Sequence, residues 1–189
     1  SKELNLNQKV VSLGGDHSIT FPIIQAYSQS YPDLNILHID AHPDLYDNFE
    51  NNPYSHASPF ARIMEKDLVN RLVQVGIRTL NDHQKEQVKR FGVEVIEMNN
   101  FDSSLLLQFD GPVYISIDID ALDPAFAPGI SHLEPGGLST RDVINIIYQL
   151  NGNVVGGDIV EYNPDRDING MTALVGAKLL KELLGKILK

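Results

Sequence analysis

The sequence predicts an α/β fold of three layers, in which helices cover both faces of a mainly parallel sheet. Short, continuously apolar runs alternate with amphipathic stretches along the 189 residues. Apolar strands separated by helices are typical of parallel sheets that are buried on both faces. Polar residues of catalytic type follow these runs, at the strand ends where such sheets bind ligands. The length and the 42% hydrophobic content suit one core, so we expect residues 1–189 to form a single domain.

The first strand is expected over residues 9–14, and the others over 35–40, 72–77, 93–98, 113–118 and 153–159. Each run is rich in the β-branched and aliphatic residues that favour strands. Helices are expected over 19–30, 59–66, 82–91, 140–150 and 171–189. Ser139 or Thr140 can cap the fourth helix at its N-terminus, and Lys186 and Lys189 suit the negative end of the last helix dipole.

Composition excludes several classes of partner and site. The formal net charge of -10 argues against nucleic acid or an anionic membrane as a partner and is compatible with a small cationic substrate. The chain has no Cys, so any metal must be held by nitrogen and oxygen ligands. No apolar run reaches the roughly 18 residues of a membrane span. We therefore expect a soluble, intracellular protein, whether cytoplasmic or organellar.

The segment "DAHPD" follows the second predicted strand and places Asp40, His42 and Asp44 in strict alternation. Alternating residues on an extended backbone point the same way, so these three side chains are expected to converge. Carboxylates so close together repel one another unless a cation lies between them. The spacing therefore predicts a cation site.

Three more segments bring similar residues to the same edge of the sheet. "GGDHS" follows the first strand, "SIDIDALDPAFAPG" the fifth and "DIVEYNP" the sixth. The combined donor set has two imidazoles and four carboxylates, which fit two divalent ions: His17, Asp40, His42, Asp44, Asp118 and Asp120. Oxygen-rich ligation without thiolates favours Mn, Mg or Fe. Two ions that share a water would activate it as a nucleophile, so the predicted reaction class is metal-assisted hydrolysis.

These four segments resemble the signature segments of the ureohydrolase family, the arginases and agmatinases. "DLYDNFE", "YSHASPFARIME", "VGIRTLN" and "HLEPGGLS" look closest to plant-type arginases. The resemblance implies an arginase-like α/β fold, two Mn²⁺ ions per chain and hydrolysis of L-arginine to L-ornithine and urea. It also implies a homo-oligomer, a trimer or a hexamer, and a mitochondrial location if the chain is plant-like.

The resemblance also assigns roles by position. His17 and Asp44 are expected to bind one ion and His42 and Asp118 the other, with Asp40 and Asp120 bridging them. Asp120 would also steer the attacking hydroxide by a hydrogen bond.

Four further positions concern the substrate. Glu161 matches the glutamate that binds the guanidinium, a cation well suited to paired hydrogen bonds with a carboxylate. His56 matches a loop histidine that passes a proton to the leaving amine. Tyr46 and Asn81 stand where animal-type arginases read the amino-acid end of the substrate, and Asn81 lacks the charge to pair with an α-ammonium.

Three alternatives stay open at this point. The first is that agmatine, which lacks the α-carboxylate of arginine, is the substrate. The second is that the chain has the related deacetylase fold, which uses one zinc ion. A non-catalytic fragment or assembly subunit is suggested because "GGDHS" begins at Gly14, nearer the start of the chain than in the family. This predicts that upstream strands are absent and that the strand at 9–14 is an exposed apolar edge.

Structural roles are expected for the remaining polar residues near the motifs. Asp16 and Asp123 are predicted to hold turns, and Asp158 to support a neighbouring loop. His38 is predicted to be a hydrogen-bonded core histidine and His83 a surface residue. For His132 the substrate-side and structural interpretations are both kept.

Overall fold

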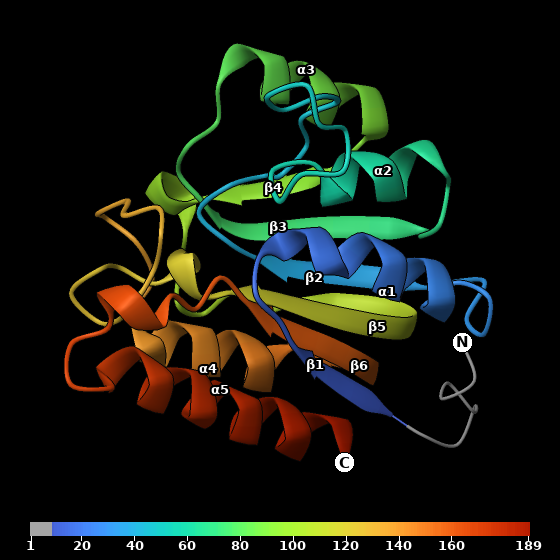
Figure 1. Ribbon diagram of the computed structural model, residues 1–189. Helices are drawn as coiled ribbons and strands as arrows, with labels where there is room; N and C mark the ends of the chain where they lie inside the picture. The colour runs from blue at the N-terminus through green and yellow to red at the C-terminus, as the bar shows by residue number, and fades with distance from the viewer. Residues whose placement is uncertain (1–8) are drawn as a thin grey trace.

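A computed structural model describes residues 9–189 and shows six strands in one sheet (Figure 1). The strands are β1 (Val10–Leu13), β2 (Asn35–Ile39), β3 (Arg71–Ile77), β4 (Glu94–Glu97), β5 (Gln108–Asp118) and β6 (Asn151–Val160), in the order β1-β6-β5-β2-β3-β4. Every neighbouring pair is parallel. The predicted parallel sheet is therefore confirmed.

Helices cover both faces of this sheet. They are α1 (Thr20–Tyr27), α2 (Pro59–Glu65), α3 (Asp82–Phe91), α4 (Thr140–Gln149) and α5 (Met171–Ile187). The first three lie on one face and the last two on the other (Figure 1). Successive strand residues point to opposite faces. Ile36 accordingly packs with Phe60 of α2, and its neighbour Leu37 belongs to the core beneath α4 and α5. The three-layer fold is confirmed.

Local capping explains where the helices begin. Asn81 accepts a hydrogen bond from the Gln84 amide at 2.9 Å and so caps α3. Ser139, rather than Thr140, caps α4 and forms a capping box with Asp142. α3 ends at Gly92, whose φ of 65° is readily adopted by glycine.

Two predicted boundaries were wrong by three residues or more, and the others agree to within two residues. α1 ends at Tyr27 rather than at residue 30, because residues 28–30 form a turn in which the Ser30 amide donates to the Tyr27 carbonyl at 2.9 Å. β5 begins at Gln108 rather than at residue 113. The first part of β5 has no continuous apolar run, so the sequence did not mark it as a strand. This part is also irregular, with a register shift between Gln108 and Pro112.

Within residues 9–189, β1 is an edge strand that pairs only with β6. Leu13 at its end is 65% exposed. The predicted exposed apolar edge is thus present in the described part of the chain.

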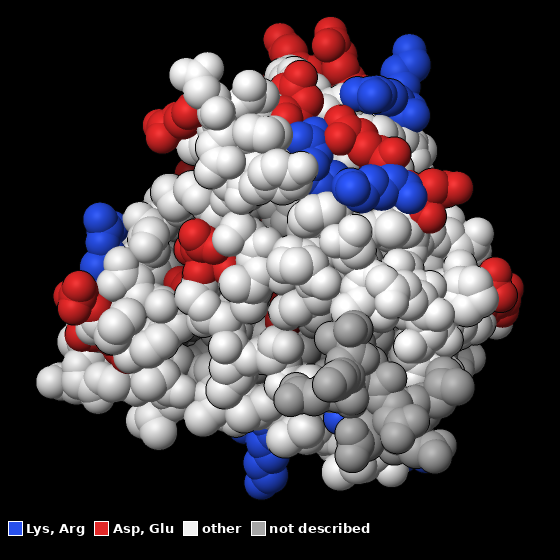
Figure 2. Space-filling view, turned by 45° about the vertical axis from the view of Figure 1, so that its right-hand side comes forward, with Lys and Arg blue, Asp and Glu red and all other residues white. Residues whose placement is uncertain are grey.

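Charged side chains are unevenly distributed over the face that Figure 2 shows. Basic and acidic side chains are gathered together on the part of the molecule that carries α3, and most of the rest of this face is uncharged. None of the helices in residues 9–189 is both long and apolar enough to cross a membrane.

Candidate metal centre and active site

The predicted site residues lie at the carboxyl edge of the sheet. His17 begins a 3-10 turn that follows β1, and Asp16 caps that turn as predicted. Asp40, His42 and Asp44 follow β2, Asp118 ends β5, and Glu161 follows β6. The strand ends of four parallel strands therefore deliver the cluster to one place.

Three carboxylates surround the His17 imidazole. Its Nδ1 lies 3.2 Å from Asp40 Oδ2, 3.0 Å from Asp44 Oδ2 and 3.2 Å from Asp118 Oδ2. His17 is fully buried, yet this nitrogen makes no hydrogen bond with acceptable geometry among the described residues. Although burial opposes it, Asp118, Asp40 and Asp44 raise the pKa of His17 well above its ordinary value, so this nitrogen favours a positive charge, either a proton or a metal cation.

A second group forms around His42. Its Nδ1 lies 3.1 Å from Asp120 Oδ2 and 3.5 Å from Asp40 Oδ1. The two oxygens of Asp40 therefore face different imidazoles, Oδ2 that of His17 and Oδ1 that of His42.

The contacts within the cluster pair the carboxylates with the imidazoles differently from the partition that the resemblance implies. Asp118 contacts His17 rather than His42, and Asp120 contacts His42 but not His17. Asp40 alone contacts both imidazoles. The reason is that β5 ends at Asp118, and the 3-10 turn at Ile119–Ala121 redirects the chain before Asp120, which sequence spacing did not reveal.

Asp40, His42 and Asp44 do not alternate along an extended strand, although their spacing had predicted this. The chain beyond Ile39 is not extended, and Asp44 has a φ of 51°. Asp40 Oδ1 accepts the His42 amide at 2.7 Å, which closes a tight turn. The residues converge as predicted, but a turn rather than a strand brings them together.

The electrostatics of the cluster indicate that it lacks positive charge. Burial, together with the charge of Asp40, raises the pKa of Asp44 to about 7 and that of Asp120 to about 6. Burial, followed by the charges of Asp120 and Asp40, raises the pKa of Asp118 well above its ordinary value. Carboxylate oxygens and imidazole nitrogens in this arrangement fit divalent cations.

A hydrogen-bond relay lies behind His17. Its Nε2 lies 2.9 Å from Ser116 Oγ, and Ser116 donates to Asp158 Oδ1 at 2.7 Å. Thr20 and Tyr114 donate to Asp158 Oδ2, each at 2.9 Å. Because the Ser116 proton goes to Asp158, its oxygen accepts from His17 Nε2, which leaves the Nδ1 lone pair facing the carboxylates. Asp158 is fully buried and supports His17 rather than a neighbouring loop.

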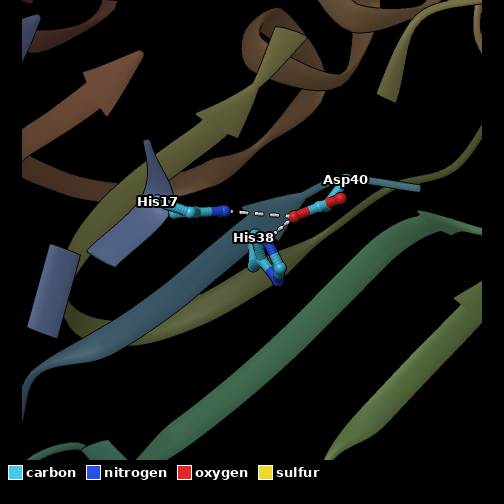
Figure 3. Close-up of side chains that lie close together, drawn as sticks. All are labelled: His17, His38 and Asp40. Carbon is cyan, nitrogen blue, oxygen red and sulfur yellow. Dashed lines mark hydrogen bonds and ion pairs between the residues drawn. The ribbon is translucent and has the colours of Figure 1, made fainter. Parts of the chain in front are cut away.

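His38 is a hydrogen-bonded core histidine, as predicted. It is fully buried, and its Nε2 lies 2.7 Å from Asp40 Oδ2 (Figure 3). Its Nδ1 lies 3.0 Å from Gln74 Nε2. Burial lowers the pKa of His38 to about 4, so the ring is neutral.

A pocket of about 510 Å³ opens over the carboxylates. It is lined by four of the predicted ligands and all four predicted substrate residues, among others: His42, Asp44, Asp118, Asp120, Tyr46, His56, Asn81 and Glu161. Among residues 9–189, no Lys or Arg lines it. Such a pocket attracts cations.

Glu161 has a constrained position at the edge of this pocket. Its φ is 64°, and its amide donates to the Gly15 carbonyl at 2.7 Å. Its Oε1 accepts the His17 amide at 2.8 Å. Glu161 therefore ties the β6 end to the His17 turn while its carboxylate lines the pocket.

Two histidines form one wall of the pocket. The rings of His56 and His132 are stacked with centroids 5.4 Å apart, and the His132 ring lies 6.0 Å from that of His42. Burial, with the neighbouring His56 and His42, lowers the pKa of His132. This geometry favours the substrate-side interpretation of His132.

Tyr46 and Asn81, which also line the pocket, contact each other. Asn81 Nδ2 donates to the Tyr46 hydroxyl, and Asn81 Oδ1 caps α3. The Tyr46 ring stacks on His83 at 5.5 Å, and His83 Nε2 lies 3.2 Å from Asp47 Oδ1. The His83 side chain is 40% exposed, so it is a surface residue that also supports Tyr46.

Three supporting residues were missed in the sequence: Ser116, Gln74 and Arg78. Arg78 donates to the carbonyl of Asp120 at 2.7 Å and to that of Glu134 at 2.6 Å, so it joins two loops of the site. The signal available for Gln74 and Ser116 was a polar residue inside an otherwise apolar strand. Asp123 holds a turn, as predicted, by accepting the Gly136 amide at 2.7 Å.

The fold and the cluster define an α/β protein with a candidate metal centre at the carboxyl edge of its sheet. The Arginase family matches residues 1–185. The chain belongs to this family.

Named relatives agree with this assignment. Arginase 1, mitochondrial, from Arabidopsis thaliana is 58% identical over 186 residues, which cover 94% of this chain and 54% of the relative. An agmatinase from Bacillus anthracis is 35% identical over 97% of this chain and 66% of its own length. The chain thus spans about half the length of the plant relatives that it matches.

Solved structures share the fold. An arginase from Medicago truncatula superposes with a TM-score of 0.91 at 53% identity, covering 95% of this chain and 60% of that one. A triple mutant of an arginase-like protein from T. brucei, bound with Mn²⁺, superposes with a TM-score of 0.85 at 36% identity, covering 95% and 62%.

Proposed function

We propose that residues 1–189 form a single catalytic domain of an arginase-type ureohydrolase, which hydrolyses L-arginine to L-ornithine and urea. The observation that carries the proposal is the pocket over four buried carboxylates and two imidazoles, with Glu161 at its edge. The plant arginases at more than half identity support the choice of reaction.

We propose that this centre binds two Mn²⁺ ions per chain. His17, Asp40, Asp44 and Asp118 would hold one ion, and His42, Asp40 and Asp120 the other, following the contacts described above. The oxygen-rich donor set and the Mn²⁺ in the T. brucei relative support this metal. When bound, such ions supply a hydroxide at neutral pH by lowering the pKa of a shared water.

The residues of the chain would handle the substrate and the protons. The carboxylate of Glu161 binds the planar guanidinium through paired hydrogen bonds. Asp120 orients the attacking oxygen by accepting its hydrogen bond. His56 carries a proton to the departing amine, a task suited to an imidazole.

Agmatine is the second candidate substrate, and one observation favours it. Besides the candidate ligands, Glu161 and the histidines, the pocket lining includes the neutral residues Tyr46, Thr79, Asn81 and Gln84. An α-ammonium meets no carboxylate among these four residues, and an α-carboxylate meets no Lys or Arg. The higher identity to plant arginases keeps arginine first.

Two further properties are proposed, the oligomeric state from the family resemblance and the compartment from the names of the relatives. The chain would act as a homo-oligomer, a trimer or a hexamer, and in an organelle, since several relatives are named mitochondrial. Because the chain spans about half of these relatives, a non-catalytic assembly subunit is the alternative of another class.

The test is a metal count with parallel assays of urea release from arginine and agmatine after manganese loading. Two Mn²⁺ per chain and urea from one substrate would establish both the centre and the substrate. One zinc ion would favour the deacetylase alternative. Metal below one equivalent with no urea would favour the assembly subunit.

Variants test the separate roles. Asp120→Ala and His42→Ala should abolish urea release, whereas Asp102→Ala, at an exposed carboxylate, should leave it unchanged. His56→Ala should lower kcat more than it raises KM. Full urea release by Asp120→Ala would refute the metal assignment, and an effect of His56→Ala on KM alone would remove it as the proton carrier.

A further inference from the structure

A buried polar chain reaches Asp40 from the interior of the sheet. It begins at Gln74 on β3 and passes through His38 on β2, and all three side chains have no exposed surface. His38 and Gln74 are register partners in the parallel pair of β2 and β3. They therefore lie side by side on the same face of the sheet, with Asp40 just beyond the end of β2.

The hydrogen bonds that join Gln74, His38 and Asp40 run in one direction, from Gln74 towards Asp40. Gln74 Nε2 donates one hydrogen to the Pro43 carbonyl at 2.7 Å and lies 3.0 Å from His38 Nδ1. The opposite amide orientation would set its oxygen against the Pro43 carbonyl oxygen. Nδ1 of His38 is therefore an acceptor, so Nε2 carries the proton and donates to Asp40 Oδ2 at 2.7 Å.

By distance alone, His38 is also a candidate ligand. Its ring nitrogen, that of His17 and an oxygen of Asp40 lie within 4.8 Å of one another (Figure 3). Both nitrogens of His38 are, however, already committed, one to Gln74 and one to Asp40. The Phe60 ring, stacked on His38 at 3.9 Å, restricts its rotation. No lone pair is left to bind a cation.

The hydrogen bond from His38 determines how Asp40 is turned. Asp40 Oδ2 accepts from His38 and faces His17 at 3.2 Å. Its Oδ1 accepts the His42 amide at 2.7 Å and lies 3.5 Å from His42 Nδ1. Rotation of this carboxylate would disturb both groups of ligands at once, because Asp40 is the residue they share.

We propose that Gln74 and His38 are positioning residues, not ligands, that hold Asp40 as the carboxylate shared by the two metal sites. The inference rests on the proposed metal centre. Residues that orient a ligand typically change metal affinity by about 10- to 100-fold when they are replaced.

The first test measures Mn²⁺ dissociation constants of the whole chain by competition with a chelator. Gln74→Leu removes the amide at similar volume and should weaken Mn²⁺ binding about 10-fold or more. Val75→Ala is the control, because Val75 is the buried neighbour of Gln74 on β3 and its side chain belongs to the opposite core. It should lower stability and leave the dissociation constant unchanged.

Substitution of His38 separates the positioning role from a ligand role. In His38→Gln the side-chain amide can still donate a hydrogen bond to Asp40, so Mn²⁺ affinity should stay within a few-fold of wild type. His38→Leu cannot donate and should lose about 10- to 100-fold. Equal losses in both variants would indicate that His38 is a ligand and would overturn the proposal.

A measurement on the metal-free chain reads the geometry directly. In ¹⁵N-labelled protein, His38 should show a protonated Nε2 and an unprotonated Nδ1. Gln74→Glu should protonate Nδ1 as well, because the new carboxylate accepts from Nδ1 while Asp40 still accepts from Nε2. A wild-type His38 protonated at Nδ1 would overturn the proposal. An unchanged Mn²⁺ affinity in Gln74→Leu would also overturn it, as would a loss of Mn²⁺ affinity in Val75→Ala equal to that in Gln74→Leu. Wild-type protein that binds no Mn²⁺ would instead refute the proposed function, while the tautomer would still test the hydrogen-bond direction.

Discussion

Ser116→Ala tests whether the relay behind His17 supports the candidate centre. The Ser116 hydroxyl joins two fully buried groups, His17 Nε2 at 2.9 Å and Asp158 Oδ1 at 2.7 Å. The substitution removes one oxygen and one hydrogen bond on each side. It leaves His17 Nε2–H without an acceptor and Asp158 with two of its three hydroxyl donors, those of Thr20 and Tyr114.

The expected loss of stability follows from these two groups. A buried polar group without its partner costs about 1–3 kcal/mol, so the pair predicts a loss of about 2–6 kcal/mol. For a chain of this size, about 1 kcal/mol corresponds to a shift of about 2–4 °C in Tm. Even the lower bound therefore predicts a fall in Tm of at least about 4 °C.

The assay is chemical and thermal unfolding in EDTA, followed by a Mn²⁺ titration of the same samples. Without Ser116, the orientation of the His17 lone pair is less restricted, so Mn²⁺ affinity should fall about 10- to 100-fold. Ser28→Ala is the control, because its hydroxyl bonds the Gln25 carbonyl of its own helix at 3.2 Å, near the surface. A loss below about 0.5 kcal/mol in Ser116→Ala, with unchanged Mn²⁺ affinity, would refute the relay.

Three further outcomes are expected. Removal of divalent ions with EDTA should lower the free energy of unfolding by about 2.7 kcal/mol for each bound ion, relative to protein held at about 100 times the Kd for Mn²⁺, and melts that do not depend on Mn²⁺ would count against the centre. Arg71, which bonds Glu94 at 2.6 and 2.8 Å, holds the pKa of that carboxyl below its ordinary value. The pair therefore stabilises the fold above the unfolded pKa, and about 0.5 kcal/mol is lost as the pH falls through the folded pKa. Glu94→Gln should remove this acid-dependent part of the stability profile, and an unchanged profile would contradict it. Gly157→Ala should prevent folding, because a Cβ there would lie 2.5 Å from the Ile115 carbonyl oxygen. Gly15→Ala is the control, because a Cβ there meets no atom within 4 Å, and it should change the free energy of unfolding by less than about 0.5 kcal/mol. A soluble, stable Gly157→Ala would show that β5 and β6 can separate.

The layers of the fold were readable in the sequence because local signals agreed with one another. Apolar runs such as "NILHI" have the period and composition of buried parallel strands, and they became β2 and its neighbours. The capping residues Asn81 and Ser139 mark where α3 and α4 begin. Where the signal was weak, as in the irregular first part of β5, the predicted boundary was wrong.

The edge of the sheet that carries the site was also predictable. Parallel strands end at a common edge, so His17, Asp40 and Asp118 were expected at the same edge of the sheet once their strands were assigned. The pairing of carboxylates with imidazoles was not predictable in the same way. It depends on the turn at Asp44 and on the 3-10 turn at Ile119–Ala121, which redirect side chains that sequence spacing treats as equivalent.

By itself, the sequence determined the parallel three-layer architecture, the residue types at the carboxyl edge and their fitness for divalent cations. These follow from hydrophobic periodicity and from the chemistry of the side chains, which are properties of short segments. Only the tertiary structure decided that Asp40 faces both imidazoles while Asp118 and Asp120 each face one, that Ser116 joins His17 to Asp158, and that Gln74 and His38 lie behind Asp40. The physical reason is that the contacts of His17 with Ser116, of Ser116 with Asp158 and of Gln74 with His38 join residues on or next to different strands through buried hydrogen bonds. The partner of such a bond is set by strand order and register, not by neighbours in the chain.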